Sequence, residues 1–134
     1  TISYSVTGFQ TCALPIWITH ETFSGDGRQV VFIRNPDGFG MIQPDNRGFR
    51  GHSLPRAWHP GPNRDASLLV FDSHDGYVAL WSAQTGVAHL LAAREIAPGG
   101  PHPHPCFLPD DRTMVWTASG QGRPHPAIAR LLGA

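Results

Sequence analysis

The chain has 134 residues, of which 40% are hydrophobic and 15% charged, with ten positive and ten negative side chains. This length is short for more than one domain, and the composition is too apolar and too weakly charged for a disordered segment. The net charge is zero, so the chain lacks the excess positive charge that binds nucleic acid or an anionic membrane. No apolar run approaches the roughly 18 residues that span a bilayer. We therefore expect neither a nucleic-acid nor a membrane partner.

Residues 1–16 lack the pattern of strands and turns that the rest of the chain shows. They read TISYSVTGFQTCALPI, with no helical period, whereas regular strand-and-turn punctuation begins at Trp17. The tract SVTGFQTCALPI looks like a translated adaptor or assembly scar, so residues 1–16 are left out of the fold reasoning. An ordinary edge strand is the alternative. We expect Cys12 and Cys106 to be free thiols, because a single bridge would not make a disulfide framework in a chain of this size.

Three copies of one pattern organise residues 17–134, and Gly and Pro, 28 residues together, fall in the turns between short apolar runs. In each copy a His lies six residues before an Asp, and an aromatic residue lies six residues after it. The copies are His20-Asp26-Phe32, His59-Asp65-Phe71 and His104-Asp110-Trp116. The Asp positions are 39 and then 45 residues apart, which is the length of a propeller blade of four short strands.

Within each copy, the Asp marks a tight turn that precedes a β-prone inner strand. The inner strands are expected at 30–33, 68–71 and 114–116, with second turns at 35–38, 73–76 and 119–122. Residues 77–81 form the clearest further strand. Residues 87–91 suit a strand or the start of a helix, and the blade pattern favours a strand. We predict an all-β fold, a partial β-propeller of about three four-stranded blades around 17–50, 51–97 and 98–134.

Three blades do not close a ring, because closure takes four or more. Either the parent is longer and this chain is its C-terminal part, or copies assemble. Blades bury their core against neighbouring blades, so an isolated piece would expose two hydrophobic blade faces. We therefore predict poor stability and aggregation for this chain made alone.

Eight histidines are present, and their placement is informative. His20, His59 and His104 share one repeat position, and equivalent positions in successive blades surround the central channel. His102 lies two residues before His104 in a proline-rich extended segment, which places both side chains on the same side. Neutral imidazole suits Mn, Fe, Ni, Cu or Zn, and spacing does not choose among them. Capping of the next loop by hydrogen bonding is the alternative role.

Other candidate residues receive simpler interpretations. The remaining histidines are expected to be solvated surface residues of loops or outer strands: His52, His74, His89 and His125. Trp58 and Trp81 are expected to pack in the core. For a ligand that carries a carboxylate, Arg is the expected partner because its fork matches that group. Three arginines near turns are candidates, and nothing selects one: Arg50, Arg64 and Arg123.

Residues 18–27 and 102–112, in this order, resemble the C-terminal blades of the oligogalacturonate lyase family, which is similar to the TolB-type and WD40-like propellers. The resemblance covers Trp17 to about Leu132. It implies a ring of seven blades that binds manganese or another divalent cation. It further implies metal binding by His20, His102 and His104. Gly99 stands where the family has a Gln ligand, and water or His59 could fill that place.

The family cleaves unsaturated digalacturonate by β-elimination in pectin degradation, so the resemblance implies a carbon–oxygen lyase acting on an acidic oligosaccharide. The family's base, a His, and an assisting Arg would lie upstream of His20, in a region this chain lacks. We therefore expect no catalytic residue in this chain and no turnover by it alone. A cytoplasmic location is expected, because the substrates are imported small oligomers.

Two other functions stay open at the level of sequence. One is a non-catalytic TolB-like propeller that serves as a periplasmic protein-binding platform, an alternative that Gly99 favours a little. The other is a propeller domain that precedes a hydrolase.

Overall fold

The structure is a computed structural model that describes residues 17–45, 47–93, 101–119 and 123–132. The expected scar with Cys12, as well as Gly99 and the turn residues 120–122, lie outside these ranges. All regular elements of the described part are β-strands. The described residues contain no helix long and apolar enough to cross a membrane. The prediction of an all-β fold is confirmed.

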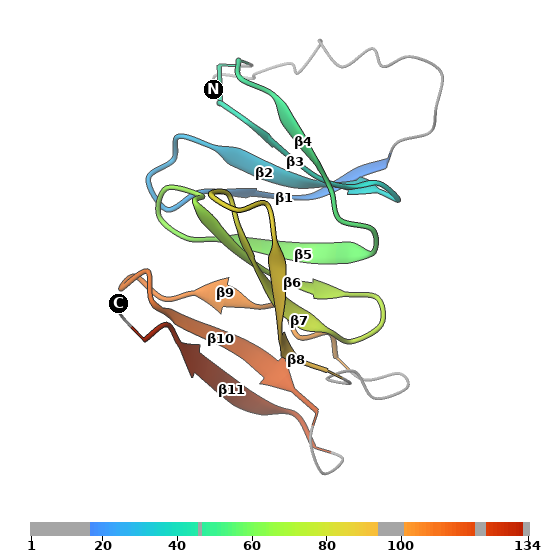
Figure 1. The fold of residues 1–134 in the computed structure, drawn as a ribbon. Helices are drawn as coiled ribbons and strands as arrows, with labels where there is room; N and C mark the ends of the chain where they lie inside the picture. Colours follow the sequence, from blue (N-terminus) through green and yellow to red (C-terminus); the bar gives the residue numbers. More distant parts are fainter. Residues whose placement is uncertain (1–16, 46, 94–100, 120–122, 133–134) are drawn as a thin grey trace, which may run out of the picture.

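The strands form three sheets that follow one another along the chain (Figure 1). The first contains β1 (Trp17–Phe23), β2 (Val30–Asn35), β3 (Gly38–Ile42) and β4 (Arg50–Ser53). The second contains β5 (Ala57–Pro62), β6 (Leu68–Ser73), β7 (Val78–Ser82) and β8 (Ala88–Ala92). The third contains β9 (Cys106–Phe107), β10 (Thr113–Ala118) and β11 (His125–Arg130).

Neighbouring strands within each sheet pair antiparallel in chain order, so each sheet is a meander. The two complete sheets have four strands each, and the third has three within the described residues. Residues 88–92 form a strand rather than a helix, as the blade pattern indicated. Successive sheets of this kind are propeller blades, and the prediction of a partial β-propeller is confirmed.

The middle sheet is buried on both faces because its strands are apolar at successive positions. Leu69 and Phe71 of β6 pack toward the first sheet in one core cluster, whereas Val70, between them, belongs to a second cluster with the third sheet. Side chains alternate between the two faces of a strand, so an unbroken apolar run fills both interfaces. The sheets therefore stack face to face, with their cores between them.

The repeated Asp residues build the turns that were expected before the inner strands. Each carboxylate accepts a backbone N–H two residues later, at 2.9, 2.9 and 3.0 Å for Asp26, Asp65 and Asp110. The residue after each Asp has a left-handed backbone: Gly27 at 70°, Ala66 at 57° and Asp111 at 56°. These turns also connect neighbouring sheets, since Asp26 N donates to Arg64 O at 2.8 Å and Arg64 N donates to Asp111 Oδ1 at 2.8 Å.

The first strands of the three sheets are neighbours, and this arrangement positions the site. β1 contacts β5, and β5 in turn contacts β9. The approach of β5 to β9 is close because Gly61 carries no side chain. A Cβ there would lie 2.4 Å from the carbonyl oxygen of Pro105 and 3.0 Å from Cys106 Cα. Cys106 itself is exposed and free, in agreement with the prediction of a free thiol.

Candidate metal centre

Four histidines gather on or beside the first strands of the three sheets. His20 lies in β1, His59 lies in β5, and His102 and His104 lie in the segment that leads into β9. Because β1, β5 and β9 are adjacent, residues that occupy equivalent positions in the repeat come together in space. The three residues proposed as ligands from sequence, His20, His102 and His104, thus reach one cluster.

The ring of His59 lies at the centre of this cluster. Its centroid is 4.5 Å from that of His20, 5.5 Å from that of His102 and 3.7 Å from that of His104. The rings of His102 and His104 are themselves 6.2 Å apart. His59 therefore contacts each of the three other imidazoles and connects them.

A buried carboxylate accepts hydrogen bonds from two residues of the cluster, and it was not among the residues predicted from sequence. Asp72, near the end of β6, is fully buried. Its oxygens accept the backbone N–H of His59 at 2.8 Å and that of His104 at 3.1 Å. Each oxygen also lies 2.9 Å from His59 Nδ1. The available signal was a single acidic residue inside an otherwise apolar inner strand, since a buried charge requires partners.

The donor set suits a divalent transition metal. His59, Asp72 and His102 each offer one ligand atom, and these atoms lie within 4.8 Å of one another. His102 Nδ1 is buried and lacks a hydrogen-bond partner among the described residues. Imidazole nitrogens with one carboxylate are ligands that Mn, Fe and Zn accept. The group of His59, Asp72 and His102 therefore fits a bound cation, with His102 supplying a free nitrogen. Of the three ligands proposed from sequence, this group contains His102, whereas His20 and His104 reach it through their contacts with the His59 ring.

The electrostatics of the cluster favour neutral rings at His20 and His104. Desolvation lowers the pKa of His20 below 6.5, and the nearby charge of His59 lowers it further. The pKa of His104 is lowered by the same two causes, desolvation first and His59 second. Only the neutral ring can donate a lone pair to a cation, so these shifts keep both side chains available as ligands.

Two of the histidines have unusual backbones. His20 has a φ of 56° and His104 a φ of 45°, both in the left-handed region that non-glycine residues seldom adopt. At His20 the pairing of β1 with β2 is also irregular, between Thr19 and Thr22. Irregularities of this kind re-aim side chains at functional sites. Two of the three histidines whose rings reach His59 thus have a left-handed backbone, which Arg56, Ala66 and Asp111 also adopt elsewhere.

Trp58 belongs to the histidine cluster and not to the core. It is half-buried, and its ring lies 4.9 Å from His20, 3.5 Å from His74 and 6.4 Å from His102, between centroids. The pairing of β5 with β6 is irregular between Ala57 and Pro60, and the Trp58 ring lies 5.7 Å from that of the adjacent His59. Core packing is thus wrong for Trp58. The same prediction is confirmed for Trp81, which is 3% exposed.

The other histidines follow the sequence prediction with one exception. His74, His89 and His125 are exposed. His52 is half-buried instead, because its ring packs 4.9 Å from that of Phe39 and 4.7 Å from that of Trp81. The arginines proposed for a substrate carboxylate are all exposed: Arg50, Arg64 and Arg123.

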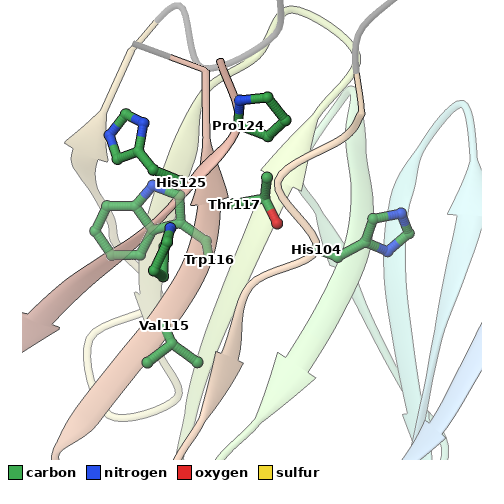
Figure 2. A pocket seen from close by; sticks show the side chains of 7 residues that line it. His104, Val115, Trp116, Thr117, Pro124 and His125 are labelled. Carbon is green, nitrogen blue, oxygen red and sulfur yellow. The ribbon is translucent and has the colours of Figure 1, made fainter.

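A cavity of about 410 Å³ lies beside the cluster, between the segment of His104 and strands β10 and β11. Trp116, Thr117 and His125 line it, and Figure 2 shows the His104 ring directed away from them. Of the four clustered histidines, His104 alone lines this cavity.

The chain is similar to oligogalacturonate lyases of known sequence and structure. An oligogalacturonide lyase of Pectobacterium atrosepticum is 24% identical, over 84% of this chain and 37% of its own length. A solved oligogalacturonate lyase in complex with manganese is 28% identical, with a TM-score of 0.70, over 86% of this chain and 35% of that one. The resemblance to oligogalacturonate lyases is confirmed. This chain spans 35–37% of the length of these two lyases.

Other solved structures share the fold of this chain. The oligogalacturonate lyase of Vibrio parahaemolyticus is 23% identical, with a TM-score of 0.67, over 84% of this chain and 35% of that one. The β-propeller domain of Swd1 from Myceliophteria thermophila and TolB from Acinetobacter baumannii, each 17% identical, have TM-scores of 0.53 and 0.54. They cover 83% and 86% of this chain and 38% and 30% of their own. No protein-family model matches the chain.

Proposed function

We propose that this chain supplies the metal-binding part of a divalent-metal-dependent lyase that cleaves unsaturated oligogalacturonides by β-elimination. One observation carries the proposal: residues on or beside the first strands of three successive blades place three imidazoles around that of His59, in a chain similar to a manganese-complexed lyase. Manganese is the proposed cation, because that lyase binds it and the donor set accepts it.

In this proposal His20, His102 and His104 hold the cation. When bound, the cation would draw in the substrate carboxylate and stabilise the negative charge that develops beside it. The reaction breaks the C5–H bond, and its electron pair forms the C4–C5 double bond while the C4–O bond breaks. The leaving oxygen then takes up a proton. The chain's own contribution is to present neutral imidazoles at fixed positions, which the lowered pKa values of His20 and His104 support.

The group that removes the C5 proton is not assigned to this chain. A base must lie within hydrogen-bond reach of the proton it takes. We propose that the base and an assisting Arg belong to the part of the lyases that this chain does not span. The purified chain is therefore expected to show no turnover of unsaturated digalacturonate, and measurable product would contradict this assignment.

Manganese titration tests the metal site directly. His104→Ala removes one imidazole and is expected to weaken manganese binding by about tenfold or more, as losses around metal ligands do. The matched control is His125→Ala, since His125 is exposed on β11 and absent from the His59 cluster. Free manganese, measured by its electron paramagnetic resonance signal, gives the affinity. Equal affinities for the wild type and His104→Ala would end the metal proposal.

A non-catalytic TolB-like platform is the second candidate, and Gly99 in place of the expected Gln is the observation that favours it. The two candidates also differ in location. A lyase of imported oligomers is proposed to be cytoplasmic, whereas a platform of the TolB kind is proposed to be periplasmic. Manganese binding that depends on His104 supports the lyase.

A further inference from the structure

We propose that His59 is a fourth protein ligand of the metal in this chain, held in place by the buried carboxylate of Asp72. The inference rests on the proposed metal-dependent function and deepens it, because it names a ligand that occupies the place left by Gly99. It concerns two residues that the lyase resemblance does not assign, and it is argued from their contacts.

The position of His59 is the first argument. A cation shared by His20, His102 and His104 must lie among their rings. The His59 ring already lies there, with centroids 4.5, 5.5 and 3.7 Å from the three others. One ligand atom of His59 is also within 4.8 Å of one from His102. An imidazole so placed would either bind the cation or obstruct it.

The hydrogen bonding of His59 is the second argument. Both oxygens of Asp72 lie 2.9 Å from Nδ1. Carboxylate oxygens accept hydrogen bonds, so in the neutral ring Nδ1 carries the proton and Nε2 keeps its lone pair. A carboxylate behind one nitrogen and a metal on the other is the usual arrangement of a ligating histidine, and it fixes the ring orientation. Asp72 thus prepares Nε2 of His59 for a cation.

The burial of Asp72 is the third argument. Its side chain is fully buried, and a negative charge removed from water requires compensation. The same carboxylate accepts the backbone N–H of His104 at 3.1 Å. It therefore fixes the ring of one ligand and the left-handed backbone of another, with a φ of 45°, across the boundary between two blades. A bound cation would complete the compensation. In this scheme Asp72 is a positioning residue.

The test measures manganese binding to the 134-residue chain and to three variants. His59→Ala is expected to lower the affinity about tenfold or more, and His59→Gln to retain part of it, because an amide oxygen also binds manganese. His89→Ala, at an exposed position on β8, is the control and is expected to match the wild type. Electron spin-echo modulation of the bound manganese counts coordinated imidazole nitrogens, and His59→Gln should lose one.

The outcomes separate this inference from the proposed function. One outcome removes His59 and keeps the metal site. In this outcome His104→Ala weakens manganese binding, His59→Ala has the wild-type affinity, and His59→Gln has the wild-type nitrogen count. His59 is then not a ligand. If the wild-type chain binds no manganese, both proposals fail. If His59→Ala does not fold, judged by circular dichroism, the nitrogen count of His59→Gln decides.

Discussion

The carboxylates of Asp72 and Asp110 lie in opposite environments, one buried and one exposed, and each binds different groups. Asp72 is fully buried and binds groups from two blades. Asp110 is exposed and orders its own turn, where it accepts the Thr113 hydroxyl at 2.7 Å and the backbone N–H groups of Thr113 and Arg112. The hydroxyl bond is the largest cause that lowers the pKa of Asp110 to about 2.

Asp110 is expected to contribute an acid-sensitive part of the stability. Its pKa is about 2 in the folded chain, below the ordinary value of 3.8, so the unfolded chain binds the proton more readily. The contribution is therefore present above 3.8 and is lost as pH falls through about 2. Urea unfolding of the wild type and Asp110→Asn should differ at pH 6 and converge toward pH 2. A difference independent of pH would contradict this.

At the scale of elements, the contact between β5 and β9 carries the site. The segment before β9 holds His102 and His104, and β5 holds His59. Gly61 lets the two backbones approach, and Thr117 N of β10 donates to Pro103 O at 2.8 Å, which holds the segment from its other side. The histidines therefore depend on a backbone contact that no side chain can replace.

Gly61→Ala is expected to destabilise the chain and weaken manganese binding. Its Cβ would lie 2.4 Å from the backbone oxygen of Pro105, which cannot rotate away, so β5 and β9 must separate. Overpacking of this kind costs about 1–3 kcal/mol. Thermal unfolding followed by circular dichroism measures the loss.

Gly27→Ala is the control for Gly61→Ala. A Cβ at Gly27 meets nothing within 4 Å, and the cost comes only from a φ of 70°. It should lose about 1 kcal/mol through backbone strain. Manganese binding should stay at the wild-type level. Equal effects of the two variants on binding would show that the contact at Gly61 does not position the site.

At the scale of the whole molecule, the two outer sheets differ from the middle one. The middle sheet is covered by a neighbour on each side, whereas the first and third sheets each have one neighbour within the described part (Figure 1). Large apolar side chains are exposed on or beside the strands of these two outer sheets, among them Phe23 at 62%, Phe49 at 53% and Ile128 at 67%. Blades bury their cores against each other, so such faces call for a partner.

The chain made alone is expected to self-associate and to unfold without a sharp transition. Apolar surface that another blade would cover is exposed to water. Association buries this surface, and the burial is favourable by roughly 25 cal/mol per Å². Size-exclusion chromatography with light scattering over a range of concentrations measures the mass. A monodisperse monomer with a cooperative thermal transition would overturn this prediction.

The sequence by itself determined the repeated unit and the places of its parts. The Asp turns, the inner strands and the histidines on the first strands follow from the regular spacing of His, Asp and aromatic residues, because turn chemistry and alternation are local. The strand at 88–92 required the blade pattern, since its local composition suits two structures.

Only the tertiary structure decided which side chains meet. The binding of His59 and His104 by Asp72, the place of Trp58 beside the histidines and the packing of His52 on Phe39 and Trp81 all join segments distant in the chain. The period of a strand says which residues share a face. It does not say which residue of the next sheet lies opposite, because the packing of two twisted sheets sets that pairing.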